Sequence, residues 1–190
     1  MQALKNRIIK DGVAIGTEIL KVDSFLNHQI DVEFLSELGK EFKNRFKDKE
    51  INKILTVEAS GIAIACMAAE YFGNPLVVFA KKTSPNTMTD EFYGAEVKSF
   101  TKGTTSIVRV SKKYIEKGDK ILILDDFLAH GEAAMGMAEL VEMGGAEVVG
   151  IGAVIEKQFQ GGSKKLKEKG YQVESLAVIQ SINDGIINFI

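Results

Sequence analysis

The sequence predicts an α/β fold in which helices flank a central, mostly parallel sheet of five strands. Five short runs of aliphatic and β-branched residues alternate with segments of helical periodicity. Each run is continuously apolar, which is typical of strands buried on both faces of a parallel sheet. The chain has 190 residues, 45% of them hydrophobic, which is enough to bury the core of one compact domain.

The segment before the first predicted strand, about residues 1–50, is expected to be mostly helical. Leu4, Ile8 and Ile9, followed by Gly12, predict a short first helix. In segment 31–46 apolar residues recur at helical spacing behind Asp31, a residue type that favours the N-cap position. This pattern predicts a second, longer helix.

The five strands and the helices between them follow in alternation. The strands are predicted at 54–57, 76–79, 121–124, 148–155 and 173–179. The helices are predicted at 61–72, 133–143 and 164–169, and glycines at 73 and 144–145 end the first two. Between the second and third strands, the polar stretch KKTSPNTMTDEFYG leads into a predicted hairpin made of GAEVKSF and TTSIVRV. An insertion of this length is usually disordered or functional, and we expect a mobile substrate lid at about 81–105.

Composition and charge exclude several classes of protein. A net charge of −2 gives no electrostatic footprint for DNA or RNA, so no nucleic-acid partner is expected. The single cysteine, Cys66, excludes an internal disulfide and a zinc set based on cysteines. No apolar run approaches the ~20 residues that span a bilayer, and MQALKNRIIKDG lacks the apolar stretch of a signal peptide. We therefore expect a cytoplasmic protein that has no membrane partner.

The most informative motif is ILILDDFLAHGEAA, in which two acids, Asp125 and Asp126, follow an apolar strand. Ligands of open parallel sheets bind beyond the carboxyl ends of the strands, where we expect both acids to lie in a turn. Two adjacent carboxylates there can accept hydrogen bonds from a vicinal diol. Alternatively, Asp126 caps the next helix and Asp125 is solvated; the pair alone does not decide between these interpretations.

Two turns next to strands could bind anions. Residues Ala129, His130, Gly131, Glu132 and Ala133 form a glycine-containing turn into a helix, which offers backbone N–H groups and a positive dipole end. A diol site and a phosphate site would then be neighbours, as in a ribose 5-phosphate. The earlier turn, residues Glu58, Ala59, Ser60 and Gly61, is also built from small residues, although Ser60 could simply cap the helix.

Other motifs are absent. The chain has no GxxxxGK[ST] sequence, and Gly150 and Gly152 lie within a predicted strand without a third glycine, which excludes a P-loop and a dinucleotide-binding fingerprint. Ser60 lacks the preceding glycine of a hydrolase elbow, and His28 and His130 cannot form a zinc set.

The motif ILILDDFLAHGEAA resembles the phosphoribosyl-diphosphate-binding signature of the type I phosphoribosyltransferases. The resemblance extends along the chain and is greatest to bacterial xanthine phosphoribosyltransferases. The stretches that carry it are LKVDSFLNHQID (20–31), VEASGIA (57–63), FAKK (79–82), SFTKG (99–103), IEKQFQ (155–160) and YQVESLAVIQSI (171–182). It implies the type I phosphoribosyltransferase fold in a single domain, residues 1–190, with a hood at about 1–50 and 157–190, a core at about 51–156 and the lid.

The resemblance also implies a reaction and roles for individual residues. The reaction is transfer of ribose 5-phosphate from phosphoribosyl diphosphate to xanthine, giving xanthosine monophosphate in purine salvage. Asp125 and Asp126 are expected to hold the ribose hydroxyls as catalytic residues, with turn 129–133 around the 5-phosphate and turn 58–61 at the diphosphate. Lys81 and Lys82 match the start of the lid, and Leu20, Asn27 and Lys157 match purine-contacting positions. Mg²⁺, held mainly by substrate oxygens, and a homodimer are further expectations.

Some features depart from the family pattern or leave alternatives open. His130 and Ala133 stand where related signatures usually carry hydroxyl side chains, and Glu132 must point away from a bound phosphate. The Asn27 amide can donate to xanthine or accept from guanine by flipping, so a guanine or hypoxanthine phosphoribosyltransferase remains an alternative. The fold also occurs in non-catalytic regulators that bind phosphoribosyl diphosphate. Those carry a winged-helix domain, for which this chain shows no basic recognition helix.

Overall fold

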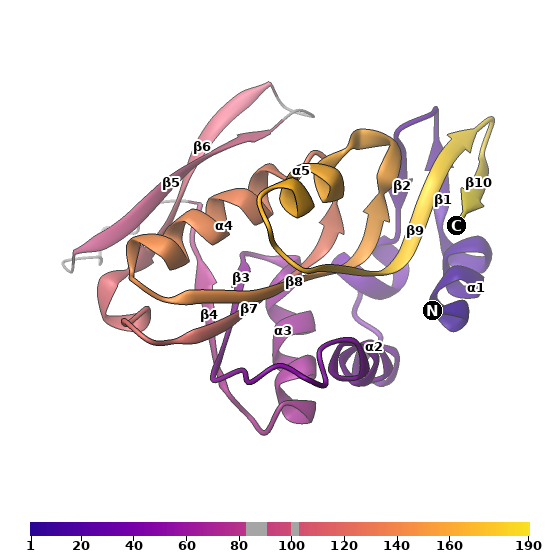
Figure 1. Cartoon of the computed structure of the whole chain (residues 1–190). Helices are drawn as coiled ribbons and strands as arrows, with labels where there is room; N and C mark the ends of the chain where they lie inside the picture. The colour runs from indigo at the N-terminus through magenta and orange to yellow at the C-terminus, as the bar shows by residue number, and fades with distance from the viewer. Residues whose placement is uncertain (83–90, 100–102) are drawn as a thin grey trace.

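The structure, a computed structural model, describes residues 1–82, 91–99 and 103–190. Its centre is a six-stranded sheet with the order β10-β9-β8-β7-β3-β4 (Figure 1). The five predicted strands are present and parallel to one another. They are β3 (Lys53–Val57), β4 (Leu76–Ala80), β7 (Lys120–Leu128), β8 (Glu147–Lys157) and β9 (Val173–Asn183). A short sixth strand, β10 (Ile186–Phe189), pairs antiparallel with β9 and extends the predicted sheet by one edge strand.

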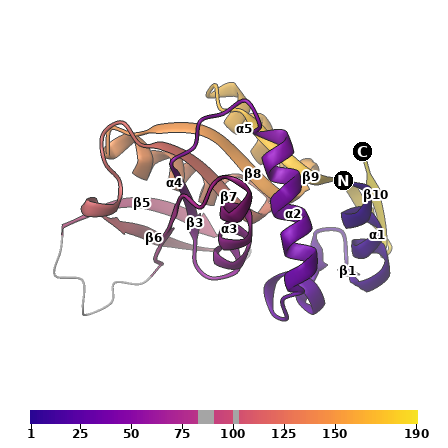
Figure 2. The ribbon, with the colours of Figure 1, turned by 90° about the horizontal axis from the view of Figure 1, so that it is seen from below.

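Helices cover the two faces of this sheet. On one face lie α2 (Val32–Arg45) and α3 (Ser60–Tyr71), which pack against each other and share a core cluster with the first helix, α1 (Gln2–Asp11). On the other face lie α4 (Glu132–Met143) and α5 (Gly162–Glu168). Figure 1 shows this layering, and Figure 2 shows α2 and α3 from the side that they cover. The arrangement confirms the α/β prediction.

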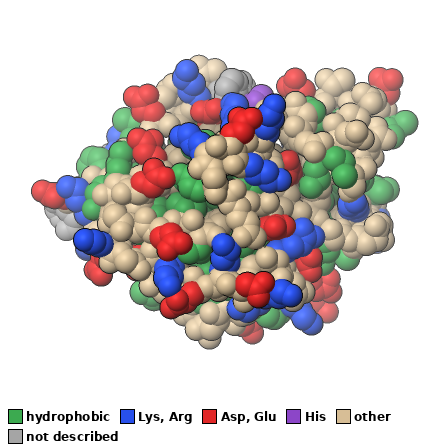
Figure 3. Space-filling view, in the orientation of Figure 1, with side chains coloured by type: hydrophobic (Ala, Val, Ile, Leu, Met, Phe, Trp, Pro, Cys, Tyr) green, Lys and Arg blue, Asp and Glu red, His purple; other side chains and the backbone are tan. Residues whose placement is uncertain are grey.

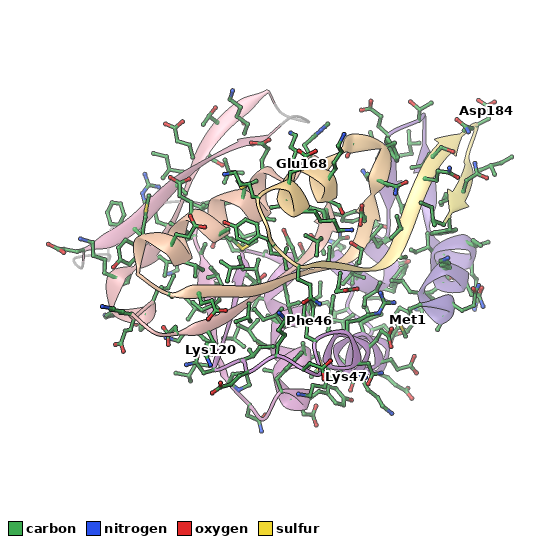
Figure 4. All side chains as sticks on the ribbon, in the orientation of Figure 1. Met1, Phe46, Lys47, Lys120, Glu168 and Asp184 are labelled. Atoms are coloured by element: carbon green, nitrogen blue, oxygen red, sulfur yellow. The ribbon has the colours of Figure 1, made fainter. Side chains whose placement is uncertain are left out.

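Two glycines of β8 let α2 approach the sheet closely. A Cβ atom on Gly150 would lie 2.4 Å from the Phe46 ring, and one on Gly152 would lie 2.8 Å from the Phe42 ring. Both rings are buried, and Figure 4 shows Phe46 below the sheet, next to α2. These glycines therefore serve helix packing, as expected from their position inside a strand.

The N-terminal segment contains the two predicted helices and a small hairpin that the sequence did not predict. Asp31 caps α2 by accepting a hydrogen bond from the Phe34 backbone N–H at 3.1 Å. Between α1 and α2 lie β1 (Val13–Ile15) and β2 (Ile19–Lys21), followed by a π-helical turn, Asp23–Asn27. The chain termini lie side by side, because the N-terminal amino group donates to the Leu176 carbonyl and Lys5 donates to the carbonyl of Ile190 (Figure 1).

The predicted hairpin between β4 and β7 is present. Strands β5 (Phe92–Ser99) and β6 (Thr104–Ser111) pair antiparallel and lie over α4. Its inner face, formed by Ala95, Val97, Val108 and Val110, is buried against that helix. Gly136 of α4 allows the contact, because a Cβ atom there would lie 2.6 Å from Val97. Of the predicted lid, residues 83–90 and 100–102 lie outside the described residues.

Acidic and basic side chains are interspersed on the face shown in Figure 3, which carries no continuous basic surface. Among the residues that the structure describes, no helix is both long enough and apolar enough to cross a membrane.

Candidate active site

The acid pair lies within strand β7, not in the turn after it. β7 pairs with β8 as far as Leu128 and Glu156, whereas its pairing with β3 ends at Leu55 and Ile123. Beyond that point β3 runs on to Val57, paired with β4 alone, before the turn that leads into α3. The prediction of a turn was therefore wrong in this detail: Asp125 and Asp126 stand on a strand extension that has a neighbouring strand on one side only.

Both carboxylates are half-buried and each accepts a local backbone hydrogen bond. Oδ1 of Asp125 accepts from the Asp126 N–H at 2.9 Å, and Oδ1 of Asp126 accepts from the Phe127 N–H at 2.9 Å. Burial raises the pKa of Asp125 well above its ordinary value, and the neighbouring charge of Asp126 adds to the rise, while the Lys82 ammonium opposes it. A cation or hydroxyl donors brought by a ligand would be stabilised at this position.

The turn between β3 and α3 reaches the same region. Glu58 and Ala59 are joined by a cis peptide bond. The Glu58 carboxylate accepts a hydrogen bond from the Lys82 backbone N–H at 2.6 Å, and the Glu58 N–H donates to the Ala80 carbonyl at 3.1 Å. The turn 58–61 and the start of the predicted lid are thus tied together, as expected if both serve one ligand.

Gly61 brings this turn against the acid pair. A Cβ atom at Gly61 would lie 2.0 Å from Oγ1 of Thr56 and 3.3 Å from Oδ1 of Asp125. No larger residue fits there unless its neighbours move. The absence of a side chain at this position therefore lets the predicted diphosphate turn approach the predicted ribose site.

The two lysines of FAKK differ in surroundings. Lys81 pairs with Arg109 of β6 through two backbone hydrogen bonds of 2.9 Å, and its ammonium lies 5.8 Å from the centre of the Phe79 ring. Lys82 is exposed and acts on Asp125 electrostatically. The backbones of both lysines are held by hydrogen bonds. Both residues directly follow the carboxyl end of β4.

The turn after β7 leads directly into α4. Gly131 is the N-cap residue with φ +85°, a conformation that glycine adopts without strain. Ala129 accepts a hydrogen bond from the Gly162 N–H at 3.0 Å, and a Cβ atom on Gly131 would lie 3.1 Å from Gly162. The start of α5 thus supports the turn. The helical hydrogen bonds of α4 begin with the Met135 N–H, which donates to the Gly131 carbonyl at 2.8 Å, so the N–H groups of Glu132 and Ala133 precede the first of them and could bind an anion.

Two side chains of this turn contact the segment that precedes and forms α5. His130 Nδ1 lies 3.2 Å from the Gln160 carbonyl oxygen. Glu132 forms an ion pair with Lys165 at 3.5 Å, so its charge is directed to a lysine. That Glu132 points away from a bound phosphate stays a prediction, since Lys165 also donates to the His130 carbonyl of this turn at 3.4 Å.

Two of the predicted base-contacting residues, Asn27 and Lys157, contact adjacent residues of β7. The Asn27 amide donates to Oδ2 of Asp126 at 3.3 Å. The Lys157 ammonium lies 5.3 Å from the centre of the Phe127 ring and donates to the Glu18 carbonyl at 2.7 Å. Burial lowers the pKa of Lys157. The structure therefore brings both side chains to the end of β7, next to the acid pair.

The other hood candidates are less directly placed. Leu20 is buried in β2 and belongs to the core cluster around α1 and α2. Phe127 is packed on the same cluster, whereas the Phe159 ring, 40% exposed, lies in the turn after β8. Of these two aromatic residues, Phe127 is the one that contacts Lys157.

Two residues that contact the predicted site residues, Glu18 and Thr56, were not predicted from the sequence. Glu18 acts through its backbone carbonyl, which no residue pattern can indicate. Thr56 is a buried polar residue inside an apolar strand, five residues before Gly61. A hydroxyl residue among apolar neighbours is the feature of the sequence that could have indicated it.

Within the described residues no group of three or more His, Cys, Asp or Glu side chains has the geometry to hold a metal ion. Any cation bound at the acid pair would need further oxygen ligands from substrate and water.

Known proteins match this chain over nearly all its length. The family model described as the phosphoribosyl transferase domain matches residues 22–188. A xanthine phosphoribosyltransferase of Ruminiclostridium cellulolyticum is 57% identical over 189 residues, covering 100% of this chain and 99% of the relative. One of Clostridium novyi has the same identity and coverage.

Solved structures agree on the fold. The adenine phosphoribosyltransferase of Rhodothermus marinus covers 94% of this chain, with a TM-score of 0.74 and 23% identity. That of Thermoanaerobacter pseudethanolicus covers 78%, with a TM-score of 0.68 and 26% identity. The family model over residues 22–188 and the relatives that are 57% identical over the full length show that the chain belongs to the phosphoribosyltransferase family.

Proposed function

We propose that this protein is a xanthine phosphoribosyltransferase, which converts xanthine and phosphoribosyl diphosphate into xanthosine 5′-monophosphate and diphosphate in purine salvage. The proposal rests mainly on two contacts at the carboxyl end of β7: Asn27 with Asp126, and Lys157 with Phe127. The xanthine phosphoribosyltransferases that are 57% identical to this chain over its full length support the choice of base.

The sugar phosphate would bind along the carboxyl end of β7. Asp125 and Asp126 accept hydrogen bonds from the ribose hydroxyls, and the backbone N–H groups of turn 129–133 hold the 5-phosphate. Turn 58–61 and the side chains of Lys81 and Lys82 bind the diphosphate. The tie between Glu58 and the Lys82 backbone supports this assignment, because it holds the two diphosphate elements together.

The base would bind between the hood and β7. Lys157 donates to the 6-oxygen of xanthine, and Asn27 donates to its 2-oxygen. Both donors already contact protein oxygens, so the base would exchange with these partners. Phe127 supplies an apolar surface at the same place, and Leu20 supports the hood from the core.

The residues suit the chemistry of the transfer. The bond between the anomeric carbon and diphosphate breaks, a bond to the base nitrogen forms, and the proton on that nitrogen passes to the departing diphosphate or to water. Positive charge develops on the sugar during this exchange, so carboxylates beneath it stabilise the transition state. Cationic groups at the leaving diphosphate have the complementary effect. Exclusion of water by the lid at 81–105 would prevent hydrolysis of the activated sugar.

The residues of this site fit a Mg²⁺ ion whose oxygen ligands come from both protein and substrate. The available donors are carboxylate oxygens, which a hard cation prefers, and the raised pKa of Asp125 indicates that a positive charge there would be favourable. Asp125 and Asp126 would face the ion, while substrate oxygens and water complete its coordination. When bound, Mg²⁺ neutralises the charge that accumulates on the diphosphate.

A homodimer and a cytoplasmic location belong to the proposal as well, the first from resemblance to the family and the second from a single cysteine. Sedimentation of the purified protein would test the dimer. Guanine or hypoxanthine transfer is the second candidate function, because the Asn27 amide can reverse its orientation. A non-catalytic regulator would bind phosphoribosyl diphosphate without turnover.

One assay distinguishes these functions. The protein is incubated with Mg²⁺, phosphoribosyl diphosphate and one purine at a time, and release of diphosphate is measured. We expect the highest kcat/KM with xanthine. Faster diphosphate release with guanine or hypoxanthine would assign that purine as the substrate. Binding of phosphoribosyl diphosphate without any release would indicate the non-catalytic regulator.

A further inference from the structure

Thr56 is a buried polar side chain without a hydrogen-bond partner. It lies on β3, is 0% exposed, and its Oγ1 makes no hydrogen bond within the described residues. Buried hydroxyl groups nearly always have a partner, and those that lack one often stand at functional sites. Since the neighbouring positions of β3 are apolar, the hydroxyl calls for an explanation other than strand packing.

The surroundings of Thr56 point to the acid pair. Its Oγ1 fills the position that a side chain on residue 61 would occupy, and the Oδ1 atom of Asp125 lies beside that position. A Cβ atom placed there would lie 2.0 Å from the hydroxyl and 3.3 Å from the carboxylate oxygen. Strand, turn and acid pair therefore meet at this point, beneath the predicted diphosphate turn.

We infer that Thr56 is a positioning residue for the proposed phosphoribosyl transfer: its hydroxyl, which has no partner in this structure, turns to the nearby Asp125 carboxyl group when the sugar phosphate is bound, hydrogen-bonds to it and fixes its orientation beneath the sugar. The inference rests on the proposed function.

The hydrogen-bonding capacity of both groups allows this contact. Oδ1 of Asp125 accepts one bond, from the Asp126 N–H, and a carboxylate oxygen can accept a second. A hydroxyl both donates and accepts, so Thr56 can donate to ionised Asp125 and accept from its protonated form. With Oδ1 held from two sides, the other oxygen is left to face the ribose.

The effect should appear in turnover more than in binding. Diphosphate and 5-phosphate are held by other parts of the site, so their affinity does not need Thr56. The carboxylate must be well oriented when positive charge develops on the sugar, and a loosely held group would stabilise that charge less. Loss of the hydroxyl should therefore lower kcat and leave KM nearly unchanged.

The test compares Thr56→Val with Thr56→Ser and with Ser111→Ala. Valine keeps the shape and the β-branch of threonine, so β3 should remain intact. Ser111 is a matched control: it is 5% exposed and its hydroxyl also lacks a partner within the described chain, but it lies on β6, outside the site. For each protein kcat and KM for phosphoribosyl diphosphate are measured with the best purine, together with the melting temperature.

We expect Thr56→Val to lower kcat about tenfold, with KM changed less than about twofold and the melting temperature unchanged or higher. Thr56→Ser should restore most of the turnover, and Ser111→Ala should match wild type. Wild-type turnover in Thr56→Val, or a loss that serine does not restore, would overturn the inference. Failure of the proposed function is separate, because the wild-type protein would then release no diphosphate with any purine.

Discussion

The side-chain amide of Asn27 donates a hydrogen bond to the carboxylate of Asp126 across 3.3 Å. The two residues are 99 positions apart in the sequence and belong to the N-terminal hood and to the central strand β7. A residue that we assign to the base thus contacts a residue that we assign to the sugar. Changes at either position should therefore affect both substrates.

Asn27→Asp should lower kcat/KM for every purine and shift the preference toward guanine. The new carboxylate would face Asp126 and repel it, which affects all bases. It would also replace a donor by an acceptor, which disfavours the 2-oxygen of xanthine and favours the 2-amine of guanine. The ratio of kcat/KM for xanthine and guanine measures the second effect. Asn183→Asp, at the exposed end of β9, is the control and should leave the ratio unchanged. An unaltered ratio in Asn27→Asp would remove Asn27 from the base site.

Asp126→Asn should keep the fold and lower turnover by on the order of 100-fold, because it removes charge facing the sugar while it preserves shape. The amide oxygen can still accept from the Phe127 N–H, so the local backbone should hold. Steady-state kinetics and circular dichroism check the two halves of this expectation. Near-normal turnover would limit Asp126 to a structural role.

Replacement of Lys81 and Lys82 together by alanine should raise KM for phosphoribosyl diphosphate and leave the melting temperature nearly unchanged. The hydrogen bonds of both residues to Arg109 and Glu58 run through the backbone, which alanine retains. The lost ammonium groups are those that we assign to the diphosphate. Lys164→Ala with Lys167→Ala, exposed lysines of α5, is a matched control for charge. A large fall in melting temperature would mean that these side chains support the fold.

Asp125→Asn should stabilise the folded protein at neutral pH. A carboxyl group whose pKa is raised by burial binds its proton more tightly in the folded than in the unfolded state. The resulting penalty is absent below the ordinary pKa of an aspartate, about 4, and grows as the pH rises toward the raised value. The melting temperature of the variant should exceed that of wild type at pH 7, and the difference should vanish near pH 4.

The exposed acid Asp48 provides the comparison for that experiment, since Asp48→Asn should change the melting temperature little at either pH. The stabilised Asp125→Asn variant should also have reduced turnover, as is common when a strained or desolvated group serves function. An Asp125→Asn protein that melts below wild type at pH 7 would contradict the assigned burial cost.

The sequence predicted the parallel strands because their apolar runs are continuous, and the helices because glycines and an N-cap residue mark their ends. It did not predict the β1–β2 hairpin, since strands as short as Val13–Ile15 carry too few residues for a periodic signal. The acids were expected in a turn because the unequal pairing of β7 with β3 and β8 is a tertiary property. The Lys157 contact with the Glu18 carbonyl, and the position of Thr56 near Asp125, likewise depend on three-dimensional packing.

The most direct test of the account is the comparison of kcat/KM for xanthine, guanine, hypoxanthine and adenine, with phosphoribosyl diphosphate and Mg²⁺ held constant. Lys157 presents a donor to the 6-position, where adenine carries an amine, so adenine would set donor against donor and could not replace the Glu18 carbonyl as the partner of Lys157, at a cost of at least ~1–3 kcal/mol. We predict that xanthine is the best substrate and that adenine is used very poorly. A preference for adenine, or equal use of all four bases, would contradict the assignment of Asn27 and Lys157 to the base site.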